Sequence, residues 1–152
     1  MDYSGFYDDF LQSKAGKQWK KTGVKRRAGV LAPLFSVYSK KSCGIGEFPD
    51  IKLLADWCVK TGMSIIQLLP MNDTGFKYTP YDAESTFALD PVYLRLEDIA
   101  GIKKEDFALK IKALKKRFPA GKARVDYSVK AEKLAILREM YDSCEKIDGA
   151  FE

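Results

Sequence analysis

Two apolar runs with an amphipathic segment between them dominate the first half of the chain. Residues 28–35 and 64–69 are almost continuously apolar, which is typical of parallel strands that are covered on both faces. Residues 49–61 carry apolar side chains three and four positions apart, with Pro49 in the first turn and Gly62 just past the end, and this pattern predicts a helix. The order of strand, helix and strand predicts a right-handed βαβ unit.

The last third of the chain alternates apolar and charged positions at helical spacing. A first helix is predicted to bury one stripe, made of Phe107, Ile111, Leu114 and Phe118. A second helix is predicted over residues 129–144, with an apolar face made of Leu134, Leu137, Met140, Tyr141 and Cys144. Pro119 and Gly121 separate the two helices, so we expect a helical hairpin rather than further strand–helix units.

A long polar loop, residues 70–93, follows the second predicted strand and is rich in aromatic side chains. A loop of this length inside a compact domain is usually functional. The carboxyl ends of parallel strands form the binding edge of α/β folds, so we expect the loops at 35–47 and 70–93 to lie at a binding site.

Composition favours a single globular domain: the chain has 152 residues, of which 46% are apolar and 31% charged. No apolar run approaches the roughly 18 residues that a transmembrane helix needs. The first residues are acidic and aromatic and do not have the pattern of a signal peptide. We therefore expect a cytoplasmic protein with no membrane partner.

Several kinds of chemistry are excluded or disfavoured. The chain has no histidine, which excludes Ser-His-Asp and Cys-His catalysis within it as well as histidine-ligated metal. Its three cysteines are widely spaced and predict neither a zinc site nor a disulfide framework. We expect Cys58 and Cys144 to be buried on helices and Cys43 to be exposed in a loop. Gly44-Ile45-Gly46 lacks the third glycine of a dinucleotide fingerprint, so no cofactor and no metal are predicted.

The net charge of +5 and the pI of about 9.0 raise the question of a nucleic-acid partner. A basic hairpin over residues 103–124 is one candidate for such binding. Its aromatic residues lie on the apolar stripe and not among the charges, so a solvated basic helix is the preferred interpretation and no nucleic-acid partner is expected.

A series of short motifs, in order along the chain, resembles the amino-terminal part of the 4-α-glucanotransferases (amylomaltases or disproportionating enzymes) of the α-amylase clan. Ser-Cys-Gly-Ile-Gly-Glu-Phe at 42–48 resembles the family's Tyr/Phe-Gly-Ile-Gly-Asp-Phe, and Ile-Gln-Leu-Leu-Pro at 66–70 resembles Trp-Gln-Val-Leu-Pro. Thr-Pro-Tyr at 79–81 resembles Ser-Pro-Tyr, and residues 85–94 resemble Ser-x-Phe-Ala-x-Asn-Pro-x-Leu. The chain departs from the pattern at Asp90, where the family has asparagine.

The resemblance implies an α/β fold that is the first βαβ part of a (β/α)8 TIM barrel, truncated, with a helical inserted subdomain. Residues 1–26 would be an amino-terminal arm that contains a short amphipathic turn. Residues 27–100 would start the catalytic barrel with strand 1, helix 1, strand 2 and the substrate loop. Residues 101–152 would be the helical hairpin of the inserted subdomain.

The resemblance also implies an enzyme that transfers α-1,4-glucan segments between malto-oligosaccharides by a retaining mechanism. Such a mechanism needs two carboxyl groups about 5 Å apart. In the family these groups lie on later barrel strands, so we expect no catalytic residue in this chain and no activity of the chain alone. The expected partners are malto-oligosaccharides and either the carboxyl-terminal part of the enzyme or a second copy, since unpaired strand edges seek partners.

Substrate contact is what this segment is expected to supply. By resemblance Tyr81 stacks on a sugar beside the scissile bond, with packing inside the loop as the alternative role. Thr79 and Asp82 are candidates for hydrogen bonds to sugar hydroxyls or for turn formation. Asn72 and Asp73 follow the second strand directly and are further candidates for substrate binding. We expect Asp73 to cap the loop. A non-catalytic glucan-binding module is the alternative function.

Overall fold

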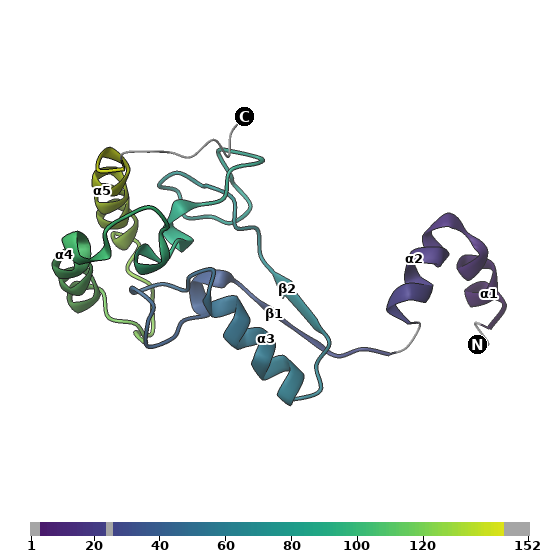
Figure 1. Cartoon of the computed structure of the whole chain (residues 1–152). Helices are drawn as coiled ribbons and strands as arrows, with labels where there is room; N and C mark the ends of the chain where they lie inside the picture. The colour runs from purple at the N-terminus through teal and green to yellow at the C-terminus, as the bar shows by residue number, and fades with distance from the viewer. Residues whose placement is uncertain (1–3, 24–25, 145–152) are drawn as a thin grey trace.

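The computed structural model describes residues 4–23 and 26–144 (Figure 1). Its helices and strands follow the chain as α1 (Ser4–Gln12), α2 (Lys14–Thr22), β1 (Gly29–Ala32), α3 (Asp50–Lys60), β2 (Ile65–Leu68), α4 (Lys104–Arg117) and α5 (Val129–Asp142). Three single 3-10 turns connect them, at Leu34–Ser36, Pro91–Tyr93 and Leu96–Asp98.

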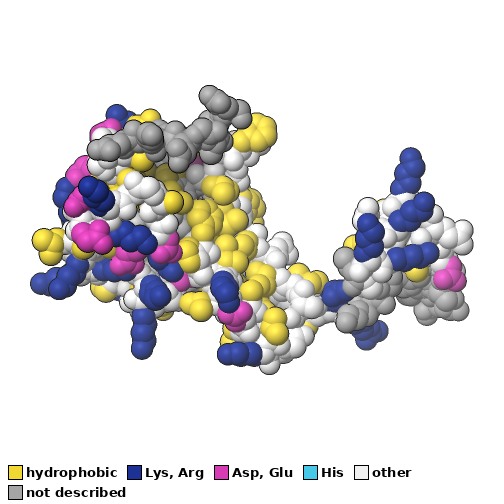
Figure 2. Space-filling model, viewed as in Figure 1, with side chains coloured by type: hydrophobic (Ala, Val, Ile, Leu, Met, Phe, Trp, Pro, Cys, Tyr) yellow, Lys and Arg dark blue, Asp and Glu magenta, His cyan; other side chains and the backbone are white. Residues whose placement is uncertain are grey.

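The amino-terminal arm contains two helices, where the sequence predicted only a short amphipathic turn. Ser13 ends the first helix and caps the second, because its hydroxyl accepts a hydrogen bond from the backbone N–H of Gly16 at 3.1 Å. A Cβ on Gly16 would lie 2.4 Å from the carbonyl oxygen of Phe10, so the tight corner between α1 and α2 requires glycine. Lysine side chains gather on this arm (Figure 2).

The predicted βαβ unit is present. β1 and β2 pair in parallel, with Gly29 opposite Ile65 and Ala32 opposite Leu68, and α3 connects them and packs against β2. The predicted helix over 49–61 is confirmed to within one residue at each end, and Gly62 follows it with a φ of 75°.

The prediction that both strands are covered on two faces is wrong for this chain. Exposed and half-buried residues alternate along β1 and β2, and Leu31 and Ile65 are 58% and 46% exposed. Among the described residues these two strands form the whole sheet. Covering both faces of a parallel sheet needs further strands and helices, so the apolar runs of this chain retain exposed surface.

The hydrophobic core lies away from the sheet, between α4, α5 and the loops that follow β1 and β2. Its buried members include Leu34, Ile45, Val92, Leu96 and the predicted stripe of Phe107, Ile111, Leu114 and Phe118. The α4 prediction is therefore confirmed. The hairpin and the loop segments before it share this one core.

The predicted apolar face of α5 is confirmed at Met140 and in part at Leu137, which packs half-buried against the core, but it is wrong at Tyr141. The buried residues of this helix are Val129, Lys130, Lys133, Ile136 and Met140, whereas Tyr141 is 57% exposed. The inward face therefore carries two lysines. Buried carboxylates neutralise both of them, which is why polar side chains occupy positions that an apolar pattern would not predict.

The loop after β1 is tightly packed, contrary to the expectation that Cys43 is exposed. Cys43 is 2% exposed, and burial raises the pKa of its thiol to about 11. Cys58 is buried as predicted and Cys144 is half-buried. A Cβ on Gly46 would lie 1.9 Å from the carbonyl oxygen of Leu34, so the Gly-Ile-Gly motif serves backbone packing here.

In the part of the chain described, no helix is long and apolar enough to cross a bilayer.

We predict that Ile111→Ala lowers the free energy of unfolding by about 3 kcal/mol, since Ile111 is 4% exposed in the shared core. Leu109→Ala is the matched control on the same helix, because Leu109 is 81% exposed, and its effect should stay within about 0.5 kcal/mol. Urea titration followed by circular dichroism measures both. Equal losses of unfolding free energy in Ile111→Ala and Leu109→Ala would contradict the placement of the core.

Candidate functional site

The carboxyl ends of β1 and β2 lie side by side, so the loops that follow the two strands leave from the same edge of the sheet (Figure 1). We call residues 70–90 the β2 loop. Its two ends are joined by an isolated antiparallel bridge between Asn72 and Leu89. The backbone N–H of Asp73 donates to the carbonyl of Ala88, and that of Asp90 donates to the carbonyl of Met71, each at 2.9 Å. The loop is therefore closed at its base.

The side chain of Tyr81 lies on the outside of this loop and is 75% exposed. Thr79 and Asp82 form the turn around it, since the backbone N–H of Asp82 donates to the carbonyl of Thr79 at 2.9 Å. The carboxylate of Asp82 also pairs with Lys77 at 3.2 Å, with both side chains more than half exposed. This arrangement leaves an aromatic face open to solvent between polar groups.

Asn72 and Asp73 are engaged within the loop. The amide of Asn72 donates to the carbonyl of Thr86 at 2.8 Å. The carboxylate of Asp73 accepts from the backbone N–H of Gly75 at 2.9 Å, which is the capping geometry expected from the sequence, and from the ammonium of Lys130 at 2.7 Å. Both side chains thus hold the base of the β2 loop in place.

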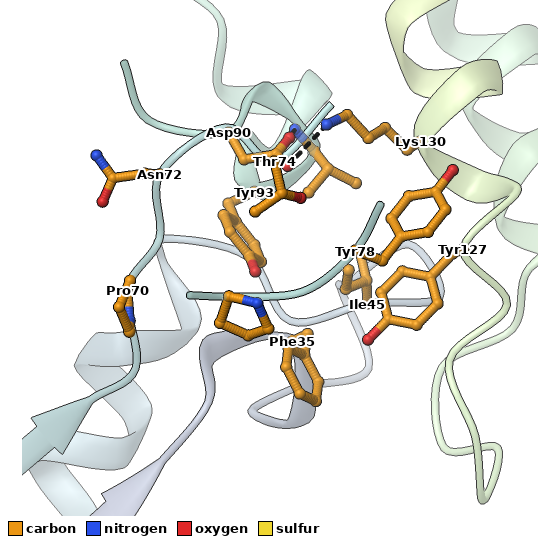
Figure 3. Close-up of a pocket in the computed structure, with 12 residues that line it drawn as sticks. Phe35, Ile45, Pro70, Asn72, Thr74, Tyr78, Asp90, Tyr93, Tyr127 and Lys130 are labelled. Atoms are coloured by element: carbon orange, nitrogen blue, oxygen red, sulfur yellow. Dashed lines mark hydrogen bonds and ion pairs between the residues drawn. The ribbon is translucent and has the colours of Figure 1, made fainter. Parts of the chain in front are cut away.

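Aromatic rings connect the β2 loop with the start of α5. The ring of Tyr78 stacks on that of Tyr127, with centroids 4.6 Å apart and planes 24° apart (Figure 3). Phe76 meets Tyr78 edge-on. Next to these rings is a cavity of about 20 Å³, whose lining includes Phe35, Thr74, Tyr93 and Lys130. It has room for about one water molecule, so a sugar ring cannot enter it.

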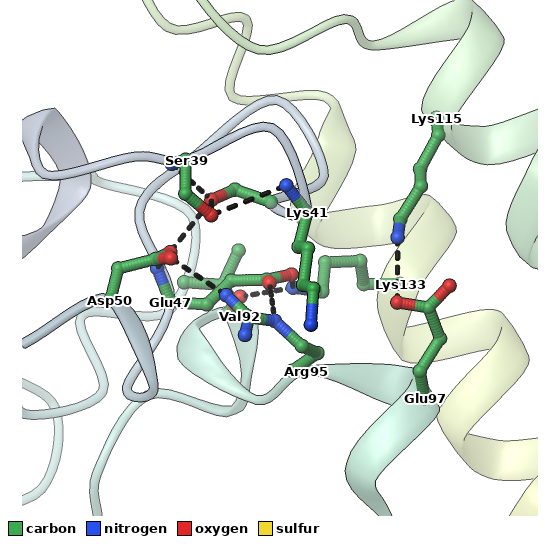
Figure 4. Close-up of polar contacts among 10 residues, drawn as sticks. Ser39, Lys41, Glu47, Asp50, Val92, Arg95, Glu97, Lys115 and Lys133 are labelled. Atoms are coloured by element: carbon green, nitrogen blue, oxygen red, sulfur yellow. Dashed lines mark hydrogen bonds and ion pairs between the residues drawn. The ribbon is translucent and has the colours of Figure 1, made fainter. Parts of the chain in front are cut away.

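A first buried ionic cluster joins the loop after β1 to α5 (Figure 4). Lys133 is fully buried and donates to Glu47 at 2.8 Å and to the carbonyl of Val92 at 2.7 Å. Arg95 donates to Glu47 at 2.8 Å and to Asp50 at 2.7 Å. Removing one partner of such a buried pair costs about 3–5 kcal/mol, so the cluster fixes this loop firmly.

Asp50 is the most hydrogen-bonded acid of this cluster. Its carboxylate accepts from the Ser42 hydroxyl at 2.7 Å and from the backbone N–H of Glu47 at 2.9 Å, besides Arg95. Burial opposes ionisation of Asp50, but these hydrogen bonds outweigh it and hold its pKa below the usual range. The cluster therefore stabilises the charged carboxylate.

A second buried cluster centres on Lys130, which is 2% exposed. Its ammonium group donates to Asp73 at 2.7 Å, to Asp90 at 2.8 Å and to the carbonyl of Gly75. Burial opposes the charge on Lys130, but the hydrogen bonds to the two carboxylates outweigh it and raise its pKa. The hydrogen bond from Lys130 in turn lowers the pKa of Asp73.

The acids of these two clusters are engaged in ion pairs within the protein. Asp90 is buried against Lys130 and also caps the backbone N–H of Val92 at 3.0 Å. Among the described residues no group of acids and cysteines has the arrangement of a metal site. The exposed ring of Tyr81 and its neighbouring polar groups form a candidate binding surface.

The comparison with known proteins identifies the family. A family model described as 4-alpha-glucanotransferase matches residues 32–151. The chain belongs to the 4-alpha-glucanotransferase family. The resemblance inferred from the sequence motifs is therefore confirmed.

Two relatives show what share of a family member's length this chain covers. It is 41% identical to a 4-alpha-glucanotransferase of Chlamydia pneumoniae over 136 residues, which cover 88% of this chain and 26% of that protein. It is also 41% identical to 4-alpha-glucanotransferase DPE2 of Oryza sativa subsp. japonica over 122 residues, which cover 76% of this chain and 13% of that protein. The chain thus spans about a quarter or less of the length of these relatives.

The fold is also found in a solved structure, that of amylomaltase from Corynebacterium glutamicum. The TM-score is 0.67 at 24% identity, over 85% of this chain and 19% of that one. At this identity the likeness concerns the fold alone, and it agrees with a partial α/β architecture in this family member.

Sequence reasoning missed Lys130 and Arg95 as organising residues. The signal for Lys130 was its place beside the apolar residues Val129 and Ile136, which lie on the buried face of the helix, so Lys130 also points inward. A lysine on an inward face needs a buried acid, and Asp90 is the acid that meets it. The sequence offered several acids, and only the folded chain selects among them.

We predict that the protein is less stable at about pH 3 than at about pH 6. The folded-state pKa values of Asp50 and Asp73 are lowered, so their contribution is complete above the unfolded value of about 3.9 and is lost as the pH falls through the folded value. Asp73→Asn should flatten this dependence in urea titrations at a series of pH values. Asp142→Asn is the exposed control. An unchanged slope for Asp73→Asn would contradict the assignment.

Proposed function

We propose that this chain is the amino-terminal part of a 4-α-glucanotransferase and that its β2 loop contacts an α-1,4-glucan. Residues 27–100 would start the catalytic (β/α)8 barrel, residues 101–152 would form an inserted helical subdomain, and residues 1–26 would be an arm. The family match over residues 32–151 supports this assignment. The exposed, apolar residues of β1 and β2 support it as well, because further barrel strands would cover them.

The observation that carries the proposal is the ring of Tyr81. It is 75% exposed on a loop whose base is closed beside the carboxyl end of β2, where barrel enzymes bind their substrates. A tyrosine offers a flat apolar face to the C–H groups of a sugar and a hydroxyl group at its edge. Thr79 and Asp82 flank the ring and are proposed to hydrogen-bond sugar hydroxyls, while Asn72 and Asp73 hold the loop.

In the proposed reaction a donor glucan is cleaved and its glucosyl portion passes to an acceptor with retention of configuration. The nucleophile and the acid would stand about 5 Å apart and would come from the parts of the enzyme outside this chain. The contribution of this chain is to hold a glucose unit in place, so that the bond to be cleaved is oriented correctly toward the catalytic acids.

A glucan-binding module without catalysis is the second candidate, and it rests on the same aromatic loop. Binding to nucleic acid is less well supported. The aromatic residues of the α4 stripe are buried, and three basic side chains of this helix pair with acids: Lys110 with Glu139, Lys115 with Glu97 and Arg117 with Glu132. These pairs leave fewer free charges for phosphate groups.

We predict that the chain binds maltoheptaose and that Tyr81→Ala weakens this binding about tenfold, which corresponds to about 1.4 kcal/mol. Isothermal titration calorimetry measures the dissociation constant. Tyr81→Phe should bind nearly as well, because it keeps the aromatic face. Tyr141→Ala is the control, since Tyr141 is 57% exposed but lies on α5. Equal affinity of Tyr81→Ala and the unmodified chain would remove Tyr81 from the site.

We also predict that the chain alone releases no glucose from maltotriose, because it lacks the acid pair that the reaction needs. A coupled glucose assay with a complete family member as positive control measures this. Turnover by the purified chain would show that catalytic acids are present within it. The proposal that these acids come from outside this chain would then be overturned.

A further inference from the structure

The first turn of α5 and the residues just before it contact the β2 loop at two places. The ammonium group of Lys130 binds Asp73, where the chain enters the loop, and Asp90, where it leaves. Three residues earlier, before α5 begins, the ring of Tyr127 stacks on Tyr78 inside the loop. We call Tyr127 and Lys130 the α5 clamp. Figure 3 shows the two rings facing each other and the link from Lys130 to Asp90.

The contacts of Lys130 fix its side chain in one conformation. An ammonium group has three donors, and here they meet two carboxylates and the carbonyl of Gly75. The side chain is 2% exposed, so no water replaces a lost partner. It also lies 5.6 Å from the centre of the Phe76 ring, which belongs to the same loop. The position of Lys130 thus determines the position of residues 73–76.

The second contact holds a backbone conformation that is unfavourable by itself. Tyr78 has a φ of 58°, and it is the only residue other than glycine with a positive φ in the described part of the chain. Residues with a Cβ rarely adopt this left-handed conformation, and surrounding contacts must maintain it where it occurs. The stacked ring of Tyr127 supplies such a contact. Tyr81 follows only three residues later, so its direction depends on this turn.

We propose that Tyr127 and Lys130 are positioning residues, which set the orientation of the Tyr81 ring before the sugar arrives. The inference rests on the proposed function of the β2 loop and adds that the hairpin controls sugar affinity without touching the sugar. A loop that is already ordered loses less conformational freedom on binding, so the clamp raises affinity by preorganisation. Without it the base of the loop remains joined by the Asn72–Leu89 bridge, but the turn before Tyr81 is released.

The chain offers a matched control for this idea. Lys133 lies three residues after Lys130 on the same face of α5 and is also fully buried. It binds Glu47 and the carbonyl of Val92, which both lie outside the β2 loop. Lys130→Met and Lys133→Met therefore each remove one buried ammonium group from one helix, but only the first releases the loop.

The experiment compares dissociation constants for maltoheptaose, corrected for the folded fraction, which circular dichroism gives. Both lysine variants should be less stable, but only Lys130→Met should bind about tenfold more weakly. Two milder variants serve if the lysine variants unfold. Asp73→Asn weakens one clamp contact at a residue that is 34% exposed, and Tyr127→Leu removes the stack. Each should weaken binding at least threefold, whereas Tyr127→Phe keeps the ring and should bind normally.

The results separate this inference from the function on which it rests. If the unmodified chain does not bind maltoheptaose, both the function and the inference are overturned. If it binds and Tyr81→Ala binds about tenfold more weakly, but Asp73→Asn and Tyr127→Leu bind like the unmodified chain, only the inference is overturned. An equal loss of affinity in Lys130→Met and Lys133→Met would also overturn the inference. The weaker binding would then follow from the lower stability of both variants.

Discussion

Two buried lysines of α5 connect segments that lie far apart in the sequence, and the rest of the structure depends on them. Lys133 binds Glu47, 86 positions earlier, and Lys130 binds Asp73, 57 positions earlier. Each ammonium group thus ties the helical hairpin to a loop that follows one of the two strands. Burying a charge is costly unless it is paired and hydrogen-bonded, so these contacts either form completely or the helix cannot pack as it does.

This constraint explains the uneven burial of the molecule. In the described part of the chain, every buried side-chain nitrogen or oxygen has a hydrogen-bond partner, and the deepest burial surrounds the ionic clusters. The sheet is different, because β1 and β2 leave apolar side chains such as Leu31 exposed. The loops that follow β1 and β2 are thus organised by the hairpin rather than by the sheet from which they emerge.

A buried ion pair gives little net stability compared with well-packed apolar residues of similar volume, because both charges lose their hydration. An apolar side chain in place of Lys130 would tolerate several positions of the β2 loop, whereas an ammonium group accepts only the one that brings Asp73, Asp90 and the Gly75 carbonyl together. The loop that carries Tyr81 can therefore be exposed to solvent and still have a defined base.

The sequence by itself determined the parts of the protein that depend on local periodicity and motif. Spacing predicted α3, α4 and the parallel strand pair, and the motif order from 42–48 to 85–94 predicted the family. It also predicted the cap of the loop by Asp73, since an aspartate two residues before a glycine N–H is local chemistry.

Only the tertiary structure decided which face of α5 is buried, why Cys43 is inaccessible and how much of each strand stays exposed. Helical periodicity favours the most apolar face, but Lys130 and Lys133 are buried because acids from distant loops meet them. Strand composition likewise predicts burial without saying whether neighbours are present to provide it. These properties depend on partners from elsewhere in the chain, and a pattern read along one segment does not contain them.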